Sequence, residues 1–578
     1  MEVSIVGDEL RIATTEEIDE PYLDKTDTGY TAYWHFIRDI SETHGTVFKI
    51  TDATRMELKR LVDNRKRVEA IIHAEVDPRE YTPMFTAAYR GSHYQTQAVK
   101  YILEQKRVVL SDDVGCGKSL IILAVILNLV EHHDKKRFLL VVPASLRLQW
   151  LSECRRFINR DMFPDLELLP VTCGGSQRQY VYNHFTKSDN AVVMIMSYNT
   201  LMKDRDKLVK MDFDLVAMDE AAKIKSKATK TNKASNKVFK NTEYKIAATA
   251  TPIENGLDDL YAIAEWVDKR RFAGKIYFQD RYCILNKITL WRPRRIDIYK
   301  VVGYKNIHDA KEKLQGIYIR RTVDDVALEL PEVIRQNIYL DLTPAQQELY
   351  ASTQDGVYED MPYQGDMGAL AMLVRLQQIC DDAAIVSKTK TGSSKLDEIM
   401  RLVTEDLKYQ KVIIISRFLH FVGSLEVAMH RAHIGYATIT GETSQEDREF
   451  IKKQFNEDPK VRVLLGSEAI QEGLNLQVAS VLINVELPWN PAKLQQRLGR
   501  LRRIGSTHTS IRVINLVVNN TIEGHVMEVL YKKGELFERM FKRDEDVKIE
   551  NLLSLSAKDI FNIVRNSGDG RPRDDNED

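Results

Sequence analysis

The amino-acid sequence predicts an α/β protein built from two parallel-sheet lobes. Seven apolar runs have the length and β-branched composition of buried strands. They are "RVVLS" (107–111), "FLLVVPAS" (138–145) and "FDLVAMDE" (213–220) in the first half, and "KVIIISRF" (411–418), "VRVLLGS" (461–467), "SVLINVEL" (480–487) and "SIRVINLVV" (510–518) in the second. Amphipathic stretches such as "SLIILAVILNLVEHH" (119–133) separate the runs, as crossover helices separate parallel strands. Two doubly wound lobes are therefore expected.

Composition and charge are those of a large globular protein. The chain has 578 residues, too many for one hydrophobic core, so several domains are expected. Its 43% hydrophobic and 29% charged residues are typical of soluble proteins, and no apolar run of about 18 residues predicts a membrane span. The start, "MEVSIVGDEL", is acidic where a secretory signal would be basic, so we expect no export.

The cysteines indicate neither a zinc site nor a disulfide framework. No CxxC pair occurs among Cys116, Cys154, Cys173, Cys283 and Cys380. A reducing interior is the simplest compartment. The net charge of −1 says little, because a nucleic-acid binder needs a local basic surface rather than a basic average.

Changes of pattern along the chain predict its domain organisation. Short strands such as "TVFKIT" and one basic amphipathic helix, "TRMELKRLVDNRKRVEAII", suggest a small piece at the start, whereas the middle of the chain lacks buried strands and looks helical. The end has the composition of a disordered acidic tail. The expected segments are an accessory domain (1–85), a nucleotide-binding lobe (86–262), helical insertions and linker (263–394), a second lobe (395–520), a helical region (521–565) and the tail (566–578).

A phosphate-binding loop is predicted in "VVLSDDVGCGKSL", directly after a strand and before a helix. Gly115 and Gly117 would let backbone N–H groups approach phosphates, Lys118 would neutralise the β and γ oxygens, and Ser119 would hold Mg²⁺. The strict GxxxxGK[ST] pattern is not met, because Asp112 takes the place of its first glycine. A plain glycine turn is the alternative, and Cys116 inside it is interpreted as a small filler.

A carboxylate pair stands at the end of the run "FDLVAMDE". Asp219 would reach the metal and Glu220 would polarise the attacking water. An Asp-Glu pair alone would more often be a helix N-cap, but combined with the GKS loop it favours an ATPase. Arg500 and Arg503 in "QQRLGRLRRIGS" are spaced to project from one helical face, where they could supply transition-state charge. A solvated basic helix is the alternative.

Lysines follow the carboxylate pair without any intervening acid. Those nearest it are Lys223, Lys225 and Lys227, and four more occur up to residue 240. Each could contact a phosphate of a nucleic acid and release counterions. A solvated helix face is the usual explanation of such a run, and the position beside a nucleotide site favours the nucleic-acid interpretation.

The order of these motifs along residues 90 to 545 resembles the Swi/Snf-type ATP-dependent DNA translocases of helicase superfamily 2. The resemblance covers "HYQTQ", "SDDVGCGKS", "VVPASLRLQW", "MSYNTL", "DEAAKIK", "ATATPIEN", "IRRTVDDVALELPE", "LTPAQQELY", the segment from "GSEAIQEG" to "RLRRIGS", and a brace helix, "TIEGHVMEVLYKKGELFERMF". It implies RecA-like lobes of P-loop NTPase type, with ATP and Mg²⁺ as cofactors. Gln95 resembles the family's adenine-reading glutamine, and Cys116 and Gly473 are implied nucleotide contacts.

The resemblance also implies contacts to the nucleic-acid backbone from both lobes. The residues implied are Ser145 and Ser197 in the first lobe and Ser416, Gly441, Thr443 and Ser467 in the second. Such contacts position the protein without reading bases, so sequence-independent binding of double-stranded DNA is expected. We expect a monomer, a DNA-bound protein as a further partner, and a location in the cytoplasm or nucleoid if prokaryotic or viral, or the nucleus if eukaryotic.

Three positions depart from the family pattern. Ala222 replaces the usual histidine, Ala250 replaces a glycine, and Ser506 replaces a glutamine. The residues expected to hold phosphate, metal and water all remain, so hydrolysis is expected to survive. In the family the missing histidine helps to couple the nucleotide site to the surface that binds nucleic acid, so Ala222 puts that coupling in doubt.

The function expected is ATP-driven movement along double-stranded DNA, with remodelling of DNA or of protein–DNA complexes. The compact form resembles bacterial, archaeal or viral members that act in DNA repair, recombination or transcription recycling. Two alternatives stay open: a strand-separating helicase of the same superfamily, and a non-hydrolysing ATP-gated DNA clamp.

Overall fold

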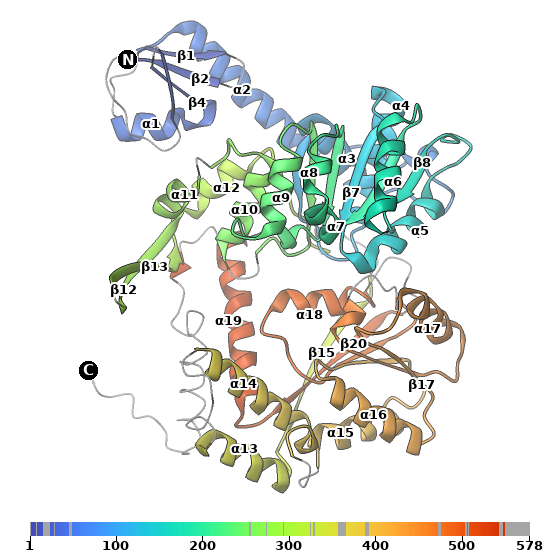
Figure 1. The fold of residues 1–578 in the computed structure, drawn as a ribbon. Helices are drawn as coiled ribbons and strands as arrows, with labels where there is room; N and C mark the ends of the chain where they lie inside the picture. Colours follow the sequence, from blue (N-terminus) through green and yellow to red (C-terminus); the bar gives the residue numbers. More distant parts are fainter. Residues whose placement is uncertain are drawn as a thin grey trace. The chain divides into compact units, whose positions relative to one another are not determined.

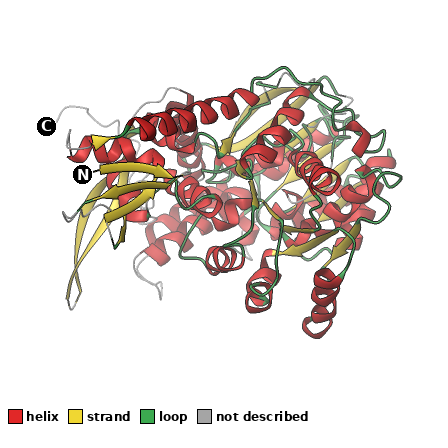
Figure 2. Ribbon diagram, turned by 90° about the horizontal axis from the view of Figure 1, so that it is seen from above, coloured by secondary structure: helices red, strands yellow, loops and turns green. Residues whose placement is uncertain are grey.

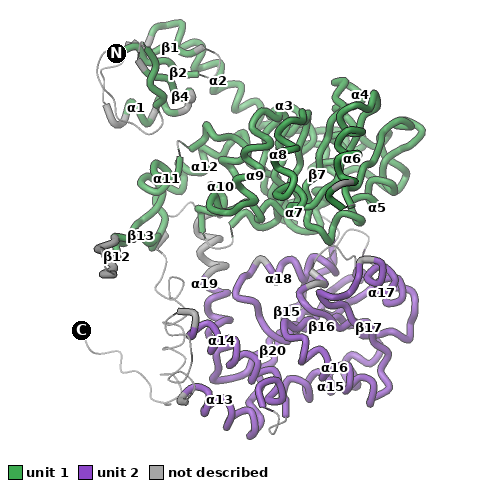
Figure 3. The backbone as a smooth tube through the Cα atoms, viewed as in Figure 1, with its two compact units in different colours: residues 1–327, 544–548 green, residues 328–543, 549–578 purple. Residues whose placement is uncertain are grey.

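The chain folds into two compact units (Figure 3). The computed structural model describes residues 2–548 except 7–8, 15–22, 28, 45–48, 173, 254–255, 273, 293, 324, 327–329, 357–365, 388–391, 472–475, 503–505, 507 and 543–546. The first unit comprises Met1–Ala327 and Asp544–Lys548, and the second comprises Leu328–Arg543 and Ile549–Asp578. In the described part of the chain, no helix combines the length and apolar character that crossing a membrane requires. The expected tail lies outside the described residues.

The first unit is centred on a seven-stranded sheet of order β14-β6-β11-β10-β7-β9-β8, in which every neighbouring pair is parallel (Figure 1). The strands are β6 (Arg107–Leu110), β7 (Arg137–Val142), β8 (Glu167–Pro170), β9 (Val192–Ser197), β10 (Leu215–Asp219), β11 (Tyr244–Ala248) and β14 (Tyr318–Ile319). The central strands are buried because helices cover the sheet. The parallel lobe predicted from the sequence is confirmed.

Helices connect the strands of this lobe, and Figure 2 distinguishes the helices from the strands by colour. The helices are α3 (His93–Gln105), α4 (Lys118–His133), α5 (Arg147–Phe157), α6 (Gly175–Lys187), α7 (Tyr198–Lys203), α8 (Arg205–Leu208), α9 (Lys230–Val238) and α10 (Leu257–Val267). The stretch Ile121–Leu129 of α4 is entirely buried, which explains why that segment is apolar all round.

A small five-stranded sheet of order β3-β4-β2-β1-β5 lies at the start of the chain. Its elements are β1 (Glu2–Val6), β2 (Glu9–Ala13), β3 (Asp24–Thr26), β4 (Gly29–Tyr33), α1 (Ile37–His44), β5 (Lys49–Ile50) and α2 (Asp52–Ile71). The long basic helix α2 packs on α3: Val68 enters the core of the lobe, and Tyr101 donates a hydrogen bond to Glu69. This piece was predicted as a small separate domain, and it is joined to the first lobe by buried contacts.

The prediction that residues 263–394 are helical is wrong for four strands. A hairpin of β12 (Cys283–Arg292) and β13 (Arg294–Tyr304) follows α11 (Lys275–Tyr282) and precedes α12 (Ile307–Leu314), and β21 (Val547–Lys548) extends it. The strands β14 and β15 (Glu332–Leu340) add edges to the sheets of the first and second unit. The strands β12, β13 and β15 carry charged and polar residues among the apolar ones, and β14 has only two residues, so none of the four has the long continuous apolar run of a buried strand.

The second unit is centred on a six-stranded parallel sheet of order β15-β20-β19-β16-β18-β17. Besides β15, its strands are β16 (Val412–Ile415), β17 (Tyr436–Ile439), β18 (Val463–Gly466), β19 (Val481–Asn484) and β20 (Ser510–Val518). Its helices are α13 (Pro344–Gly356), α14 (Asp366–Asp381), α15 (Ser394–Thr404), α16 (Leu419–Arg431), α17 (Gln445–Glu457), α18 (Pro491–Leu498) and α19 (Ile522–Lys542). The second predicted lobe is confirmed.

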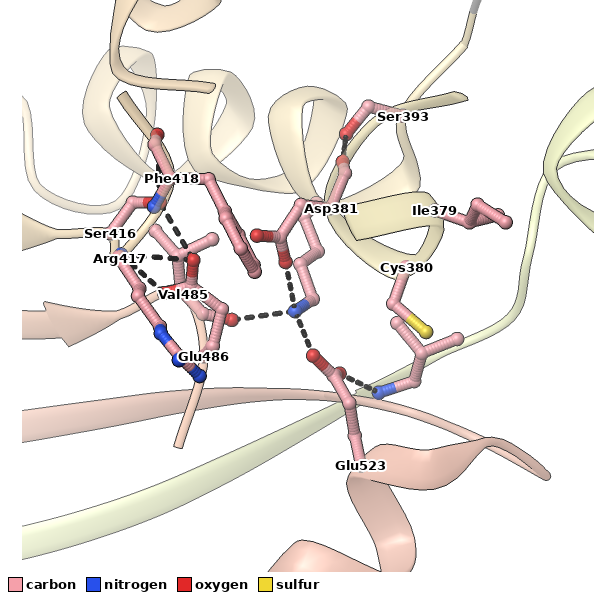
Figure 4. A network of polar contacts seen from close by, with 12 residues as sticks. Ile379, Cys380, Asp381, Ser393, Ser416, Arg417, Phe418, Val485, Glu486 and Glu523 are labelled. Atoms are coloured by element: carbon pink, nitrogen blue, oxygen red, sulfur yellow. Dashed lines mark hydrogen bonds and ion pairs between the residues drawn. The ribbon is translucent and has the colours of Figure 1, made fainter. Parts of the chain in front are cut away.

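A buried lysine, Lys395, joins four segments of this lobe, and Figure 4 labels its partners Asp381, Val485 and Glu523. The Lys395 ammonium is inaccessible to solvent and donates to Asp381 Oδ1 at 2.8 Å, to the Val485 carbonyl at 2.7 Å and to Glu523. Burial raises the pKa of the Asp381 carboxyl, and the neighbouring Glu486 raises it further. Because Glu523 lies in the first turn of α19 and Asp381 ends α14, both helices are fixed to the lobe by their hydrogen bonds to the buried ammonium of Lys395.

Candidate active site

The predicted phosphate-binding loop connects β6 to α4, as the sequence requires. Gly115 and Gly117 have φ values of 95° and 74°, a left-handed conformation that favours glycine. A Cβ atom at Gly117 would collide with the side-chain amide of Gln95. Lys118 and Ser119 open helix α4, so their backbone N–H groups belong to a helix N-terminus, where phosphate binds readily.

The side chains around the loop are tied to its carbonyl groups. Lys118 Nζ donates to the carbonyl oxygens of Asp112 and Asp113, at 2.6 and 3.0 Å. The buried Gln95 donates to the Cys116 carbonyl at 3.4 Å, so this residue contacts the loop directly. Burial, together with the charge of Asp112, raises the pKa of the Cys116 thiol to about 12. A thiol held neutral in this way is unreactive, which agrees with its interpretation as a filler.

A buried ion pair missed by the sequence analysis holds the first part of the loop. Asp112 is inaccessible to solvent, and its carboxylate accepts hydrogen bonds from Arg321 Nε at 3.0 Å, from Arg321 Nη2 and from the Arg321 main-chain N–H. The guanidinium also donates to the Tyr94 carbonyl and stacks on the Tyr94 ring at 5.1 Å. The acid that replaces the first glycine of the loop is therefore neutralised by a residue 209 positions away. The only sequence signal was the "RRT" segment.

The carboxylate pair lies at the carboxyl end of β10, two strands away from the loop strand. Leu110, Ala248 and Asp219 stand level in the register of β6, β11 and β10. Asp219 Oδ1 accepts from the Glu220 N–H at 3.0 Å, and Oδ2 accepts from Trp150 Nε1 at 2.9 Å. Glu220 has a φ of 53°, an uncommon conformation for glutamate that occurs where function or packing requires it.

The segment after β11, predicted from "ATATPIEN", lies beside the loop. The Thr249 N–H donates to the Leu110 carbonyl at 3.0 Å, and the Thr251 N–H donates to Thr249 Oγ1 at 3.2 Å. Among the described residues the buried Thr251 Oγ1 has no hydrogen-bond partner. Such an orphaned hydroxyl at the edge of the sheet is typical of a site that receives a further polar group.

Of the predicted arginine pair, the structure describes Arg500, which lies outside the expected helix. Helix α18 ends at Leu498, and Arg500 lies in the turns that follow, so Arg500 does not project from a helical face. Arg500 is 7% exposed, and Arg503 and Gly473 lie outside the described residues. Arg497 is also buried, and it donates to Asn484 Oδ1 at 2.8 Å and to the Glu486 carbonyl at 3.1 Å.

The lysines after the carboxylate pair fall into two groups. Lys223 is exposed in the turn that follows Glu220, and Lys225 is half-buried. Lys227 forms an ion pair with Glu265 in α10. The sequence suggested that no acid compensates these lysines, and for Lys227 that expectation is wrong, because Glu265 is distant in sequence but adjacent in space.

The other residues predicted to contact nucleic acid differ in their exposure to solvent. Ser145 is half-buried, Ser197 caps helix α7 by accepting from Thr200 N at 3.2 Å, and Ser467 is 9% exposed. Gly441 is exposed, and nearby Thr443 accepts from Thr440 N at 2.9 Å.

Ser416 is fully buried, and its hydroxyl donates to Glu486 at 2.7 Å (Figure 4). That position does not fit a direct contact of the Ser416 side chain with a phosphate.

Two family models match the chain in sequence order. Residues 94–385 match the SNF2-related domain, and residues 394–505 match the helicase conserved C-terminal domain. The first match alone spans half of the chain. The chain belongs to the SNF2-related family.

Relatives in this family include helicases of bacteria. An uncharacterized ATP-dependent helicase of Mycoplasma pneumoniae is 28% identical over 477 residues, which cover 80% of this chain and 44% of the relative. The uncharacterized ATP-dependent helicase YqhH of Bacillus subtilis is 23% identical over 514 residues, covering 84% of this chain and 86% of the relative. The chain thus spans less than half the length of the mycoplasma relative.

A structural comparison finds the Sulfolobus solfataricus SWI2/SNF2 ATPase core in complex with dsDNA. The TM-score is 0.35 and the sequence identity 23%, with 81% of this chain and 95% of that chain covered. The family assignment rests on the two sequence models. As an SNF2-family protein, the chain contains the SNF2-related domain followed by the helicase conserved C-terminal domain.

The donor set of the SNF2-type site fits Mg²⁺ held jointly with a nucleotide. In the described portion of the chain, no group of three or more His, Cys, Asp or Glu side chains could hold an ion by itself. Asp219 offers one carboxylate, whose oxygens accept hydrogen bonds from the Glu220 N–H and from Trp150 Nε1, and Ser119 offers a hydroxyl. Mg²⁺ is usually bound by one or two carboxylates together with phosphate oxygens and waters.

Proposed function

We propose that the protein is an ATP-dependent translocase that moves along double-stranded DNA without reading its sequence. The observation that carries the proposal is the direct succession of Asp219, Glu220 and the exposed Lys223 at the end of β10 in an SNF2-family chain. One short segment thus joins the groups expected to act on the nucleotide to a cation suited to a phosphate backbone.

The nucleotide chemistry assigns one task to each side chain. Bound Mg²⁺–ATP would supply the phosphoanhydride bond whose hydrolysis drives the cycle. Lys118 would neutralise the β and γ oxygens, and Ser119 and Asp219 would hold the metal. Glu220 would accept the proton of the attacking water. We assign the transition-state charge to Arg500 and Arg503, as in other two-lobed ATPases.

The proposed DNA-binding surface consists of predicted residues that are exposed or half-buried in each lobe. Lys223, Lys225 and Ser145 in the first lobe, and Gly441 and Thr443 in the second, are exposed or half-buried positions able to meet phosphates. Contacts of this kind fix position and orientation but read no bases. A monomer that displaces or remodels a DNA-bound protein, in DNA repair or a related process, is the finer form of the proposal.

ATP turnover measured without DNA, with single strands and with duplex tests the proposal. A Glu220→Gln variant, which keeps shape but loses the base, serves as the control. Turnover stimulated by duplex without strand displacement is the expected result. Displacement of a strand would instead identify a strand-separating helicase. ATP turnover equal to that of Glu220→Gln would instead identify a non-hydrolysing ATP-gated clamp.

A further inference from the structure

Two hydrogen bonds tie the carboxylate residue Asp219 to neighbouring segments of the first lobe. Trp150 Nε1 donates to Asp219 Oδ2 at 2.9 Å, and the Tyr198 hydroxyl donates to the main-chain carbonyl of Asp219 at 2.6 Å. Together with the Glu220 N–H on Oδ1, these bonds fix both the backbone and the side chain of Asp219. The orientation of the metal-binding group is therefore set by residues outside its own strand.

Both donors belong to segments that carry predicted backbone contacts. Tyr198 follows Ser197 directly and begins helix α7, while Trp150 lies in α5, just after the short turn Ala144–Leu146 that contains Ser145. The strands β10, β7 and β9 are neighbours in the sheet, so the segments that follow them meet at one edge. A shift of either segment under a bound phosphate would pull on Asp219 through one hydrogen bond.

The surroundings make these bonds strong and direct. Trp150 and Tyr198 are 3% and 6% exposed, so water does not compete for their donors. Burial, with Asp219 and Glu220 close by, raises the pKa of the Tyr198 hydroxyl well above its usual value, which keeps it a donor. Neither residue carries charge, and each makes its bond to Asp219 with a single group.

Position 222 cannot contribute in the same way. Its methyl side chain has no donor or acceptor, whereas the SNF2-type histidine expected there can bond to neighbouring motifs. The connections that the structure does provide run through Trp150 and Tyr198.

We propose that Trp150 and Tyr198 are positioning residues that transmit DNA contact to the ATPase by setting the orientation of Asp219. The inference rests on the proposed function, because it assumes that DNA contacts the segments that carry Ser145 and Ser197. It names the residues that couple the nucleotide site to the DNA-binding surface in a chain that lacks the usual histidine.

Conservative variants of the full chain test this inference. Tyr198→Phe removes one hydroxyl, and its matched control is Tyr182→Phe, because Tyr182 is also buried and donates to Asp204 at 2.6 Å in the same lobe. Trp150→Phe removes an indole donor, and its matched control is Trp266→Phe, since the buried Trp266 Nε1 has no hydrogen-bond partner among the described residues. Each pair loses similar packing, but only one member loses a bond to Asp219.

The measured quantity is the ratio of duplex-stimulated to DNA-free ATP turnover, with KM for ATP and thermal stability determined alongside. We expect the ratio to fall about threefold or more in Tyr198→Phe and about tenfold in Trp150→Phe, the sizes expected for losing a hydrogen bond to a neutral and to a charged acceptor. Both controls should keep the wild-type ratio, and KM for ATP should change less than the ratio.

Two results would overturn the inference while the proposed function stands: an unchanged ratio in Tyr198→Phe and Trp150→Phe, or an equal fall in the variants and their controls, which would indicate packing alone. A wild-type enzyme that duplex DNA does not stimulate would contradict the proposed function, and the inference with it.

Discussion

Breaking the ion pair between Arg321 and Asp112 should destabilise the first lobe and weaken nucleotide binding. The side chains are 8% and 0% exposed, so solvent screening does not reduce the effect. Arg321→Met leaves the Asp112 carboxylate buried without its partner, which costs about 3–5 kcal/mol in comparable buried pairs. Because Lys118 bonds to the carbonyls of Asp112 and Asp113, a displaced Asp112 also disturbs the phosphate-binding loop. We expect KM for ATP to rise about tenfold, which corresponds to about 1.4 kcal/mol.

The assay combines thermal unfolding of the full chain with the ATP dependence of turnover. Arg320→Met is the matched control, because Arg320 reaches Asp113 only at 3.6 Å and both side chains are partly exposed. Such a pair contributes less than about 1 kcal/mol. The double variant Asp112→Leu with Arg321→Met should recover most of the stability, since an apolar pair carries no buried charge. Equal effects of Arg321→Met and Arg320→Met would refute this reasoning.

Three further predictions concern coupling, the DNA-binding surface and pH. Ala222→His should change the DNA stimulation of turnover more than the DNA-free rate, and equal stimulation in both forms would show that position 222 has no coupling role. Lys223→Ala should reduce the magnitude of the slope of log affinity for duplex against log salt concentration by about 1. Lys227→Ala should reduce it less, because the Lys227 ammonium is paired with Glu265. Equal slopes for the two variants would contradict the proposed DNA-binding surface. Burial lowers the pKa of Lys245 to about 8, so below that pH the folded state carries a buried charge. Because the unfolded chain keeps this proton up to about pH 10.5, the free energy of unfolding should rise between about pH 8 and 10.5. Denaturant unfolding of Lys245→Met across this pH range should lack that rise.

The sequence predicted the parts of the site that depend on local chain order. Gly115, Gly117 and Lys118 follow a strand and open a helix, and Asp219 ends a strand, so one short stretch of sequence contains all the information needed. The two lobes followed from apolar runs for the same reason. Each of these features depends on about ten consecutive residues, and over such a length the hydrophobic pattern predicts the local structure.

The rest depends on contacts between distant residues. Arg321 meets Asp112 across 209 positions and Trp150 meets Asp219 across 69, and no local pattern encodes either contact. The same holds for Lys227, whose partner Glu265 lies 38 positions away.

The error at Arg500 is of another kind. Gly499 directly follows α18, and a glycine just after a helix often marks its end, so the sequence contained a signal against a continuous helix through Arg500.

Release of a third strand from a DNA triplex tests the central claim most directly, because a translocase on duplex DNA must displace that strand when it arrives. We predict ATP-dependent release after a lag that grows with the length of duplex to be crossed, while the two duplex strands stay paired. Glu220→Gln should bind the same DNA and release nothing. Release that is independent of ATP, equal release by Glu220→Gln, or ATP turnover on duplex without any release would contradict the account.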